Sequence, residues 1–110
     1  MKLITILAAG ALLLSQAMYA EAATTAERHL NQGATCAACH TDKNFEKPVH
    51  QDKCLACHGS YEKLAQRTEK VHPNPHNNHF GQRDCSTCHK GHQQSELTCD
   101  RCHKFDLKTP

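Results

Sequence analysis

Beyond its first 22 positions, the 110-residue chain has very few of the residues from which protein cores are built. Both methionines and both isoleucines fall within residues 1–22. Leu, Val and Phe together number 10 among the 88 residues that follow. Chains with less than about 20% Leu, Ile, Val and Phe usually cannot bury enough apolar surface to fold. We therefore expect something other than side chains to supply the apolar core.

The chain also lacks an apolar run long enough to cross a membrane, because a spanning helix needs roughly 20 residues. Its one largely apolar segment, residues 3–14, follows a lysine and precedes the small-x-small sequence Ala-Glu-Ala at 20–22. This layout is typical of a Sec-type secretory signal peptide. We expect residues 1–22 to be a signal peptide, cleaved after Ala22 or alternatively after Ala20. Residues 23–110 should then form one periplasmic domain without stable membrane insertion.

Cysteine and histidine are abundant instead, with 8 Cys and 10 His. Every cysteine belongs to a pair separated by two residues, and a histidine follows each pair directly. The four motifs are Cys36-Ala-Ala-Cys39-His40, Cys54-Leu-Ala-Cys57-His58, Cys85-Ser-Thr-Cys88-His89 and Cys99-Asp-Arg-Cys102-His103. C-x-x-C-H is the attachment sequence of haem c. The motifs therefore predict four covalently bound haem c groups.

The spacing within each motif suits this chemistry. Each thiol adds to one vinyl group of the porphyrin, and positions i and i+3 place both sulfurs on one side of a helical turn. The next residue then presents its imidazole to the iron as the proximal ligand. Two other uses of cysteine pairs are zinc sites with four thiolates and a disulfide framework. Neither of them explains the four adjacent histidines.

Six histidines remain as candidates for the far side of each iron. Methionine and free cysteine are excluded there, because the exported domain has no methionine and the motifs use all eight cysteines. We therefore expect bis-histidine ligation at all four irons, which leaves no open position and favours electron transfer over substrate chemistry. The residues favoured as distal ligands are His29, His76, His79 and His92. His50 and His72 stay open as replacements for any of these four.

The predicted fold is mainly α with extensive coil, wrapped around four closely packed c-type haems. Short helical turns should surround each motif, and no stretch alternates as a strand would. Ser60 can cap a helix over about Tyr61 to Lys70, and Pro73 ends the helical pattern. With so few residues for each haem, neighbouring porphyrins must lie near contact and each must expose an edge. Electrons could then enter at one exposed haem and leave at another.

The chain resembles the small tetrahaem cytochromes and, more closely, the N-terminal haem domain of flavocytochrome c fumarate reductases. The resemblance runs from about His29 to Asp106. It rests on Cys57-His58-Gly59 before a helix, Asn74-Pro-His76-Asn-Asn-His79-Phe80, Cys88-His89-Lys-Gly-His92 and Cys102-His103-Lys-Phe105-Asp106. It implies that His29, His76, His79 and His92 are the distal ligands. It also implies that His72 matches a histidine the family does not use as a ligand.

The resemblance further implies a partner. In the flavocytochromes the chain continues past the Phe-Asp ending into a flavin domain, whereas this sequence ends at Pro110 without a nucleotide-binding glycine motif. We expect a non-enzymatic carrier that acts as the electron-transfer subunit of a separate periplasmic flavoprotein reductase of the fumarate reductase type. A membrane quinol-oxidising multihaem cytochrome would be its donor.

Two alternatives remain at this stage. The first is a free shuttle between that donor and several terminal reductases, and the second is a multihaem enzyme such as a nitrite reductase, which needs an open iron. The formal net charge of +2 gives no argument for nucleic-acid binding, because the two propionates of each haem outweigh it.

Overall fold

The computed structural model describes residues 21–110, so the predicted signal peptide lies almost wholly outside the described residues. Four short α-helices and two 3-10 turns are joined by long stretches of coil, and the described residues contain no strand. The elements are α1 (Thr25–Asn31), α2 (Cys36–Cys39), α3 (Gln51–His58), α4 (Tyr61–Arg67), η1 (Cys85–Thr87) and η2 (Thr98–Arg101). The prediction of a mainly helical chain with extensive coil is confirmed to this extent.

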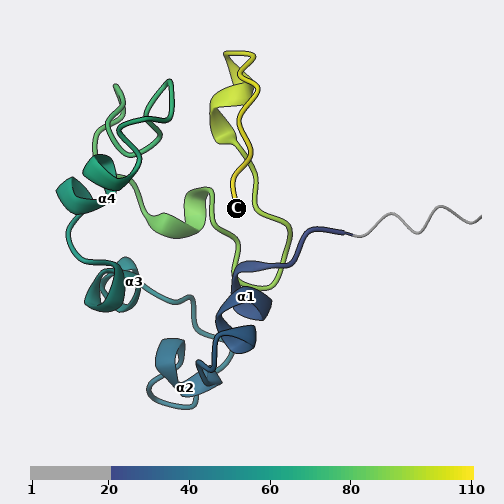
Figure 1. Cartoon of the computed structure of the whole chain (residues 1–110). Coiled ribbons are helices and arrows are strands. Elements are labelled where there is room, and N and C mark those ends of the chain that lie inside the picture. The colour runs from purple at the N-terminus through teal and green to yellow at the C-terminus, as the bar shows by residue number, and fades with distance from the viewer. Residues whose placement is uncertain (1–20) are drawn as a thin grey trace, which may run out of the picture.

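Figure 1 shows the helices following one another along an arc from α1 to α4. The chain then returns through η1 to the neighbourhood of α1, and its C-terminus lies in the middle of the view. Within residues 21–110, no helix combines the length and the apolar character needed to cross a membrane.

Capping side chains set the starts of α1 and α4. Thr24 and Glu27 form a reciprocal capping box at α1, in which the Thr24 N–H donates to the Glu27 carboxylate at 2.7 Å. At α4, the Ser60 hydroxyl accepts from the Lys63 N–H at 3.3 Å, as the sequence predicts. Gly59 separates α3 from α4 with a φ of +83°, a conformation that favours glycine. These residues fix where two helices begin without any contribution from a core.

Helix α4 ends at Arg67, three residues before the expected end at Lys70. Side chains of the residues that follow form hydrogen bonds with the last carbonyl oxygens of the helix. The Thr68 hydroxyl lies 2.8 Å from the Leu64 carbonyl oxygen, and the Asn74 amide donates to the Ala65 carbonyl oxygen at 2.8 Å. Side chains of the loop therefore satisfy the helix terminus before Pro73 can act.

The described residues contain no buried hydrophobic side chain. Their one buried residue is Thr98, at 8% exposure, whereas Phe45 and Phe80 are 63% and 58% exposed. Helices of seven or eight residues are too short to be stable alone in water. The expectation that side chains alone cannot make the core is confirmed for this part of the chain.

We predict that the polypeptide is unfolded when it is made without haem attachment. Neither apolar burial nor helix length then offsets the conformational entropy of about 1–2 kcal/mol per residue. Far-UV circular dichroism should lack helical bands, and the amide proton spectrum should be poorly dispersed. The matched control is the same chain matured with haem. Native-like helix content in the haem-free chain would contradict the prediction.

Candidate functional site

Eight histidine rings are arranged in four pairs, and each pair joins a motif histidine to one of the four histidines favoured as distal ligands. The ring centroids are separated by 5.9 Å for His29 and His58, 6.2 Å for His40 and His92, 6.3 Å for His76 and His89, and 6.1 Å for His79 and His103. Two pairs are nearly parallel and two are nearly perpendicular.

The separation suits a metal ion between the rings. An imidazole nitrogen binds a first-row metal at about 2.0–2.1 Å, so two rings on opposite sides of one ion have centres roughly 6 Å apart. Within residues 21–110, no group of three or more His, Cys, Asp or Glu side chains is placed to hold a metal. A tetrahedral zinc site takes four protein ligands, whereas each pair offers two imidazole rings. This donor set matches the two axial positions of an iron whose other ligands come from a porphyrin.

The motifs themselves form tight turns. The histidine N–H donates to the carbonyl oxygen of the first cysteine at 2.9 Å in three motifs, from His40, His89 and His103. In the remaining motif, the second along the chain, Cys54 to His58 lie within α3. A helical turn therefore keeps the two thiols and the imidazole of each motif close together, as the attachment chemistry requires.

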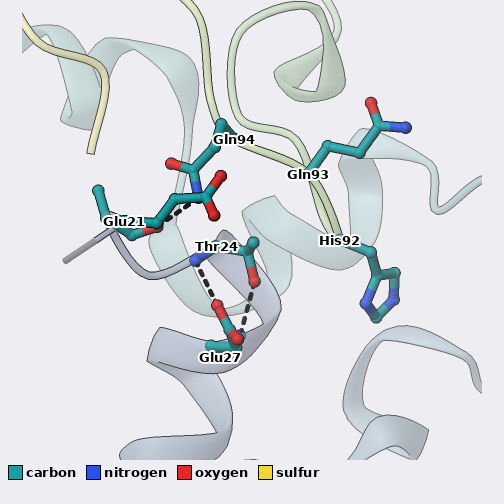
Figure 2. A pocket seen from close by; sticks show the side chains of 7 residues that line it. Glu21, Thr24, Glu27, His92, Gln93 and Gln94 are labelled. Carbon is teal, nitrogen blue, oxygen red and sulfur yellow. Dashed lines mark hydrogen bonds between the residues drawn. The ribbon is translucent and has the colours of Figure 1, made fainter. Parts of the chain in front are cut away.

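Helix α1 lies against the segment that carries His92. The Ala26 N–H donates to the Gly91 carbonyl oxygen at 2.8 Å, and the Gln94 side-chain amide donates to the Ala22 carbonyl oxygen. Figure 2 shows Thr24 and Glu27 at the start of α1 beside Gln94, with the His92 ring turned away from them. The N-terminal segment and residues 91–94 are thus held together, although more than 60 residues separate them in the sequence.

One ring nitrogen of His29 is committed to the backbone. Its Nδ1 lies 2.7 Å from the Thr25 carbonyl oxygen, one turn earlier in α1. A carbonyl oxygen can only accept, so Nδ1 carries the proton and Nε2 keeps its lone pair. Ligating histidines commonly hold their second nitrogen in this way, which orients the ring.

Burial lowers the pKa of both His76 and His89, and their mutual repulsion when charged lowers that of His76 further. The two rings are parallel to within 2°. Burial and charge repulsion both favour the neutral imidazole, which is the form that binds a metal.

Cys54 and Cys85 lie side by side where α3 meets η1. Burial, and after it the neighbouring Cys85, raises the pKa of the Cys54 thiol to about 11. Burial also raises the pKa of Cys85. Thiols that resist ionisation are poor nucleophiles, so neither is suited to cysteine catalysis. None of the eight cysteines forms a disulfide, and the second and third motifs lie next to each other here.

Comparison with known proteins also supports a haem-binding chain. The sequence model of the family described as cytochrome c3 matches residues 28–104, well over half of the chain. The chain belongs to the cytochrome c3 family. The resemblance to small multihaem cytochromes is therefore confirmed, and the chain is an electron-transfer protein with covalently bound c-type haem.

Similar curated proteins include fumarate reductases. A protein of Shewanella frigidimarina named "Probable fumarate reductase Ifc3" is 39% identical over 83 residues, which are 73% of this chain and 14% of that protein. A "Fumarate reductase (cytochrome)" of the same organism is 37% identical over 90 residues, 77% of this chain and 16% of that protein. A "Cytochrome c-type protein Cgr1" of Eggerthella lenta is 38% identical over 53 residues, 46% of this chain and 24% of that protein. The chain spans about a seventh of the fumarate reductases it matches.

Three phenylalanines of this cytochrome c3 domain contact histidine rings rather than each other. The centroid separations are 5.3 Å for Phe45 and His40, 4.3 Å for Phe80 and His79, and 5.0 Å for Phe105 and His103. Aromatic contacts of this kind restrict the orientation of a ring. Both histidines of the pair that uses the fourth motif are flanked in this way.

Two predicted alternatives lie apart from the ring pairs. His50 precedes α3 as its N-cap residue, and its charge helps to lower the pKa of Asp84, after the hydrogen bonds from Ser86. His72 is exposed and precedes Pro73. Neither belongs to the four histidine pairs described above. Their geometry gives no support for replacing a favoured ligand.

Sequence reasoning missed Thr68 and Arg83, which both contact the histidine-bearing elements. Thr68 was counted as part of a longer helix, and its hydroxyl lies 3.1 Å from Nδ1 of His76. A hydroxyl residue shortly before an Asn-Pro-His sequence is the signal that could have found it. Arg83 carried no signal of its own, because its contacts join segments that are distant in the sequence.

Arg83 links the loop after His79 to the start of η2. Its guanidinium carbon lies 4.7 Å from the centroid of the Phe80 ring, and its Nη1 donates to the buried Thr98 hydroxyl at 3.1 Å. The Thr98 oxygen also lies 3.4 Å from the Cys88 sulfur. One side chain thus connects the elements that carry the third and fourth motifs.

Replacing Arg83 with methionine should lower the free energy of unfolding by about 1–2 kcal/mol. The change removes a cation–π contact worth about 0.5–1 kcal/mol and a hydrogen bond to a buried hydroxyl worth about 1 kcal/mol. Guanidinium chloride denaturation of the haem-loaded protein measures the loss. Arg101→Met is the matched control, because its side chain is 72% exposed and its ion pair with Glu96 should contribute at most about 0.5 kcal/mol. Equal losses for the two variants would contradict the assignment.

Proposed function

We propose that this chain is a periplasmic tetrahaem cytochrome that passes single electrons to a separate flavoprotein reductase of the fumarate reductase type. The observation that carries the proposal is the set of four histidine pairs, each joining one motif to one further histidine at about the separation expected across one metal ion. When bound, haem iron supplies a one-electron couple.

The four ring pairs support a proposal in which two histidines would bind each of four haem irons. His58 and His29 serve the second motif, His40 and His92 the first, His89 and His76 the third, and His103 and His79 the fourth. The eight motif cysteines hold the four macrocycles by thioether bonds. With a histidine on each side, an iron would have no position left for a substrate, so the chain would act as a carrier rather than as an enzyme. Histidine on both sides also keeps the potential lower than a methionine ligand would.

The assignment predicts a specific spectroscopic change. In His29→Ala, the iron of the second motif loses one axial ligand, and about a quarter of the haem should change from low spin to high spin. Electron paramagnetic resonance of the oxidised protein measures this directly. The wild type should show only low-spin ferric signals.

His72→Ala and His50→Ala are the controls, and both should keep every haem low spin. A high-spin signal from either control would instead place that residue on an iron. A high-spin signal in the wild type would revive the alternative of a multihaem enzyme with an open coordination site.

The electron acceptor is proposed from the relatives. The matched region belongs to two proteins named fumarate reductase, and the Phe105-Asp106 sequence follows the fourth motif directly. Phe105 stacks on His103, and its N–H donates to the Asp100 carboxylate at 3.4 Å, so this segment is attached to the fourth motif. A flavoprotein docking at this segment would receive electrons through the fourth haem. A membrane quinol-oxidising multihaem cytochrome is the proposed donor.

We expect the reduced cytochrome to be reoxidised rapidly by fumarate, or by a similar unsaturated acid, only when one flavoprotein is added. Stopped-flow absorbance of the haem bands measures the rate, and co-purification measures the complex. A free shuttle would instead be reoxidised by several unrelated reductases without forming a stable complex. That outcome would refute a dedicated partner while leaving the electron-transfer role intact.

Residues 1–22 are proposed to be a cleaved signal peptide and residues 23–110 the tetrahaem domain. Haem c attachment outside the cytoplasm is consistent with this division. N-terminal sequencing of the haem-loaded protein should begin at Ala23, or at Glu21 if cleavage follows Ala20.

A further inference from the structure

A polar cluster closes the C-terminal end of α4 against the loop that carries His76. The Thr68 hydroxyl lies within 3.1 Å of three atoms: the Leu64 carbonyl oxygen and Asn74 Oδ1, both at 2.8 Å, and His76 Nδ1 at 3.1 Å. Asn74 adds two bonds, since its Nδ2 donates to the Ala65 carbonyl oxygen at 2.8 Å and its Oδ1 accepts from the His76 N–H at 3.0 Å. The backbone and the ring of His76 are therefore both held from the same cluster.

The positions of the protons follow from these contacts. A threonine hydroxyl has one proton to donate and can accept through its lone pairs. The carbonyl oxygen of Leu64 and Oδ1 of Asn74 can only accept, so the Thr68 proton points at one of them. Toward His76 the hydroxyl then acts as the acceptor. Nδ1 of His76 must carry the ring proton, which leaves the Nε2 lone pair free for a metal.

Neighbouring rings restrict His76 further. Tyr61 lies edge-on at 5.7 Å between centroids, and His89 lies parallel at 6.3 Å. The Thr68 contact is the one at a ring nitrogen, so it selects the tautomer as well as the orientation. At His29 the tautomer is fixed by a backbone carbonyl oxygen, which no side-chain substitution removes.

We propose that Thr68 is a positioning residue for His76. Its hydroxyl accepts a hydrogen bond from the Nδ1–H of His76 and so fixes the tautomer, the ring plane and the donor strength of Nε2. The inference rests on the proposed ligation of one iron by His76 and His89. An acceptor at Nδ1 makes the imidazole a stronger donor and favours the ferric state. Loss of the hydroxyl should therefore make that one haem easier to reduce.

Thr68→Val tests the role, because valine keeps the shape and removes the acceptor. We expect the ferric preference of one haem to fall by up to about tenfold, or about 59 mV for a one-electron couple. The low-spin signal of that haem should change its g-values, while the other three haems keep theirs. Thr68→Ser retains the hydroxyl and should restore both values.

Thr35→Val is the matched control, because Thr35 is exposed and makes no capping hydrogen bond with its side chain. It should leave all four potentials unchanged. Four unchanged low-spin signals and potentials in Thr68→Val would overturn the proposal, even if its thermal stability fell. Absence of bis-histidine low-spin haem from the wild type would instead overturn the proposed function.

A measurement on the wild type remains decisive if Thr68→Val fails to fold. Nitrogen-15 histidine spectra of the reduced protein should show a slowly exchanging Nδ1 proton on His76, close to the Thr68 side chain. Rapid exchange of that proton with solvent, or protonation at Nε2, would overturn the proposal.

Discussion

Pairs of imidazole rings about 6 Å apart connect parts of this chain that are far apart in the sequence. Several hydrogen bonds within residues 21–110 also do so, including one from the Gln82 amide to the Glu62 carboxylate. One backbone hydrogen bond joins α1 to Gly91, and Arg83 joins the loop after His79 to η2. The described residues bury no hydrophobic side chain, so packing of side chains cannot hold these segments together. We propose that haem lies between the rings, so that the fold depends on the prosthetic group rather than on packed side chains.

Local features of the fold could be predicted because they depend on neighbours in the sequence. Ser60 caps α4 and the C-x-x-C-H motifs form turns, since both need contacts only three or four residues away. The scarcity of apolar residues is a property of composition and predicted the missing core. The end of α4 was predicted incorrectly. There the helix competes with Thr68 and Asn74, whose bonds to its carbonyl oxygens depend on a loop that local propensity does not describe.

The site was predicted in part for a related reason. Motif spacing predicts the eight attachment cysteines and the four proximal histidines, and the lack of methionine beyond residue 22 points to histidine for the distal positions. Neither argument says which histidine faces which motif. His92 follows His89 by three residues, yet its ring pairs with His40 and not with its neighbour. Such pairing is set by the path of the chain, which brings α1 and residues 91–94 together.

The four proposed haem centres are chemically similar, and a chain of this size has limited means of making them differ. A polypeptide core cannot give each centre a different polarity, because the described residues form none. The differences must come from groups in direct contact with the ligands. Those contacts are unequal: His29 is held by a carbonyl oxygen and His76 by a hydroxyl, while His79 and His103 lie against phenylalanine rings. Since hydrogen bonds to ligating histidines tune a haem centre, unequal contacts imply unequal electron affinities. A carrier whose haems differ in electron affinity can favour one direction of electron flow without a conformational change.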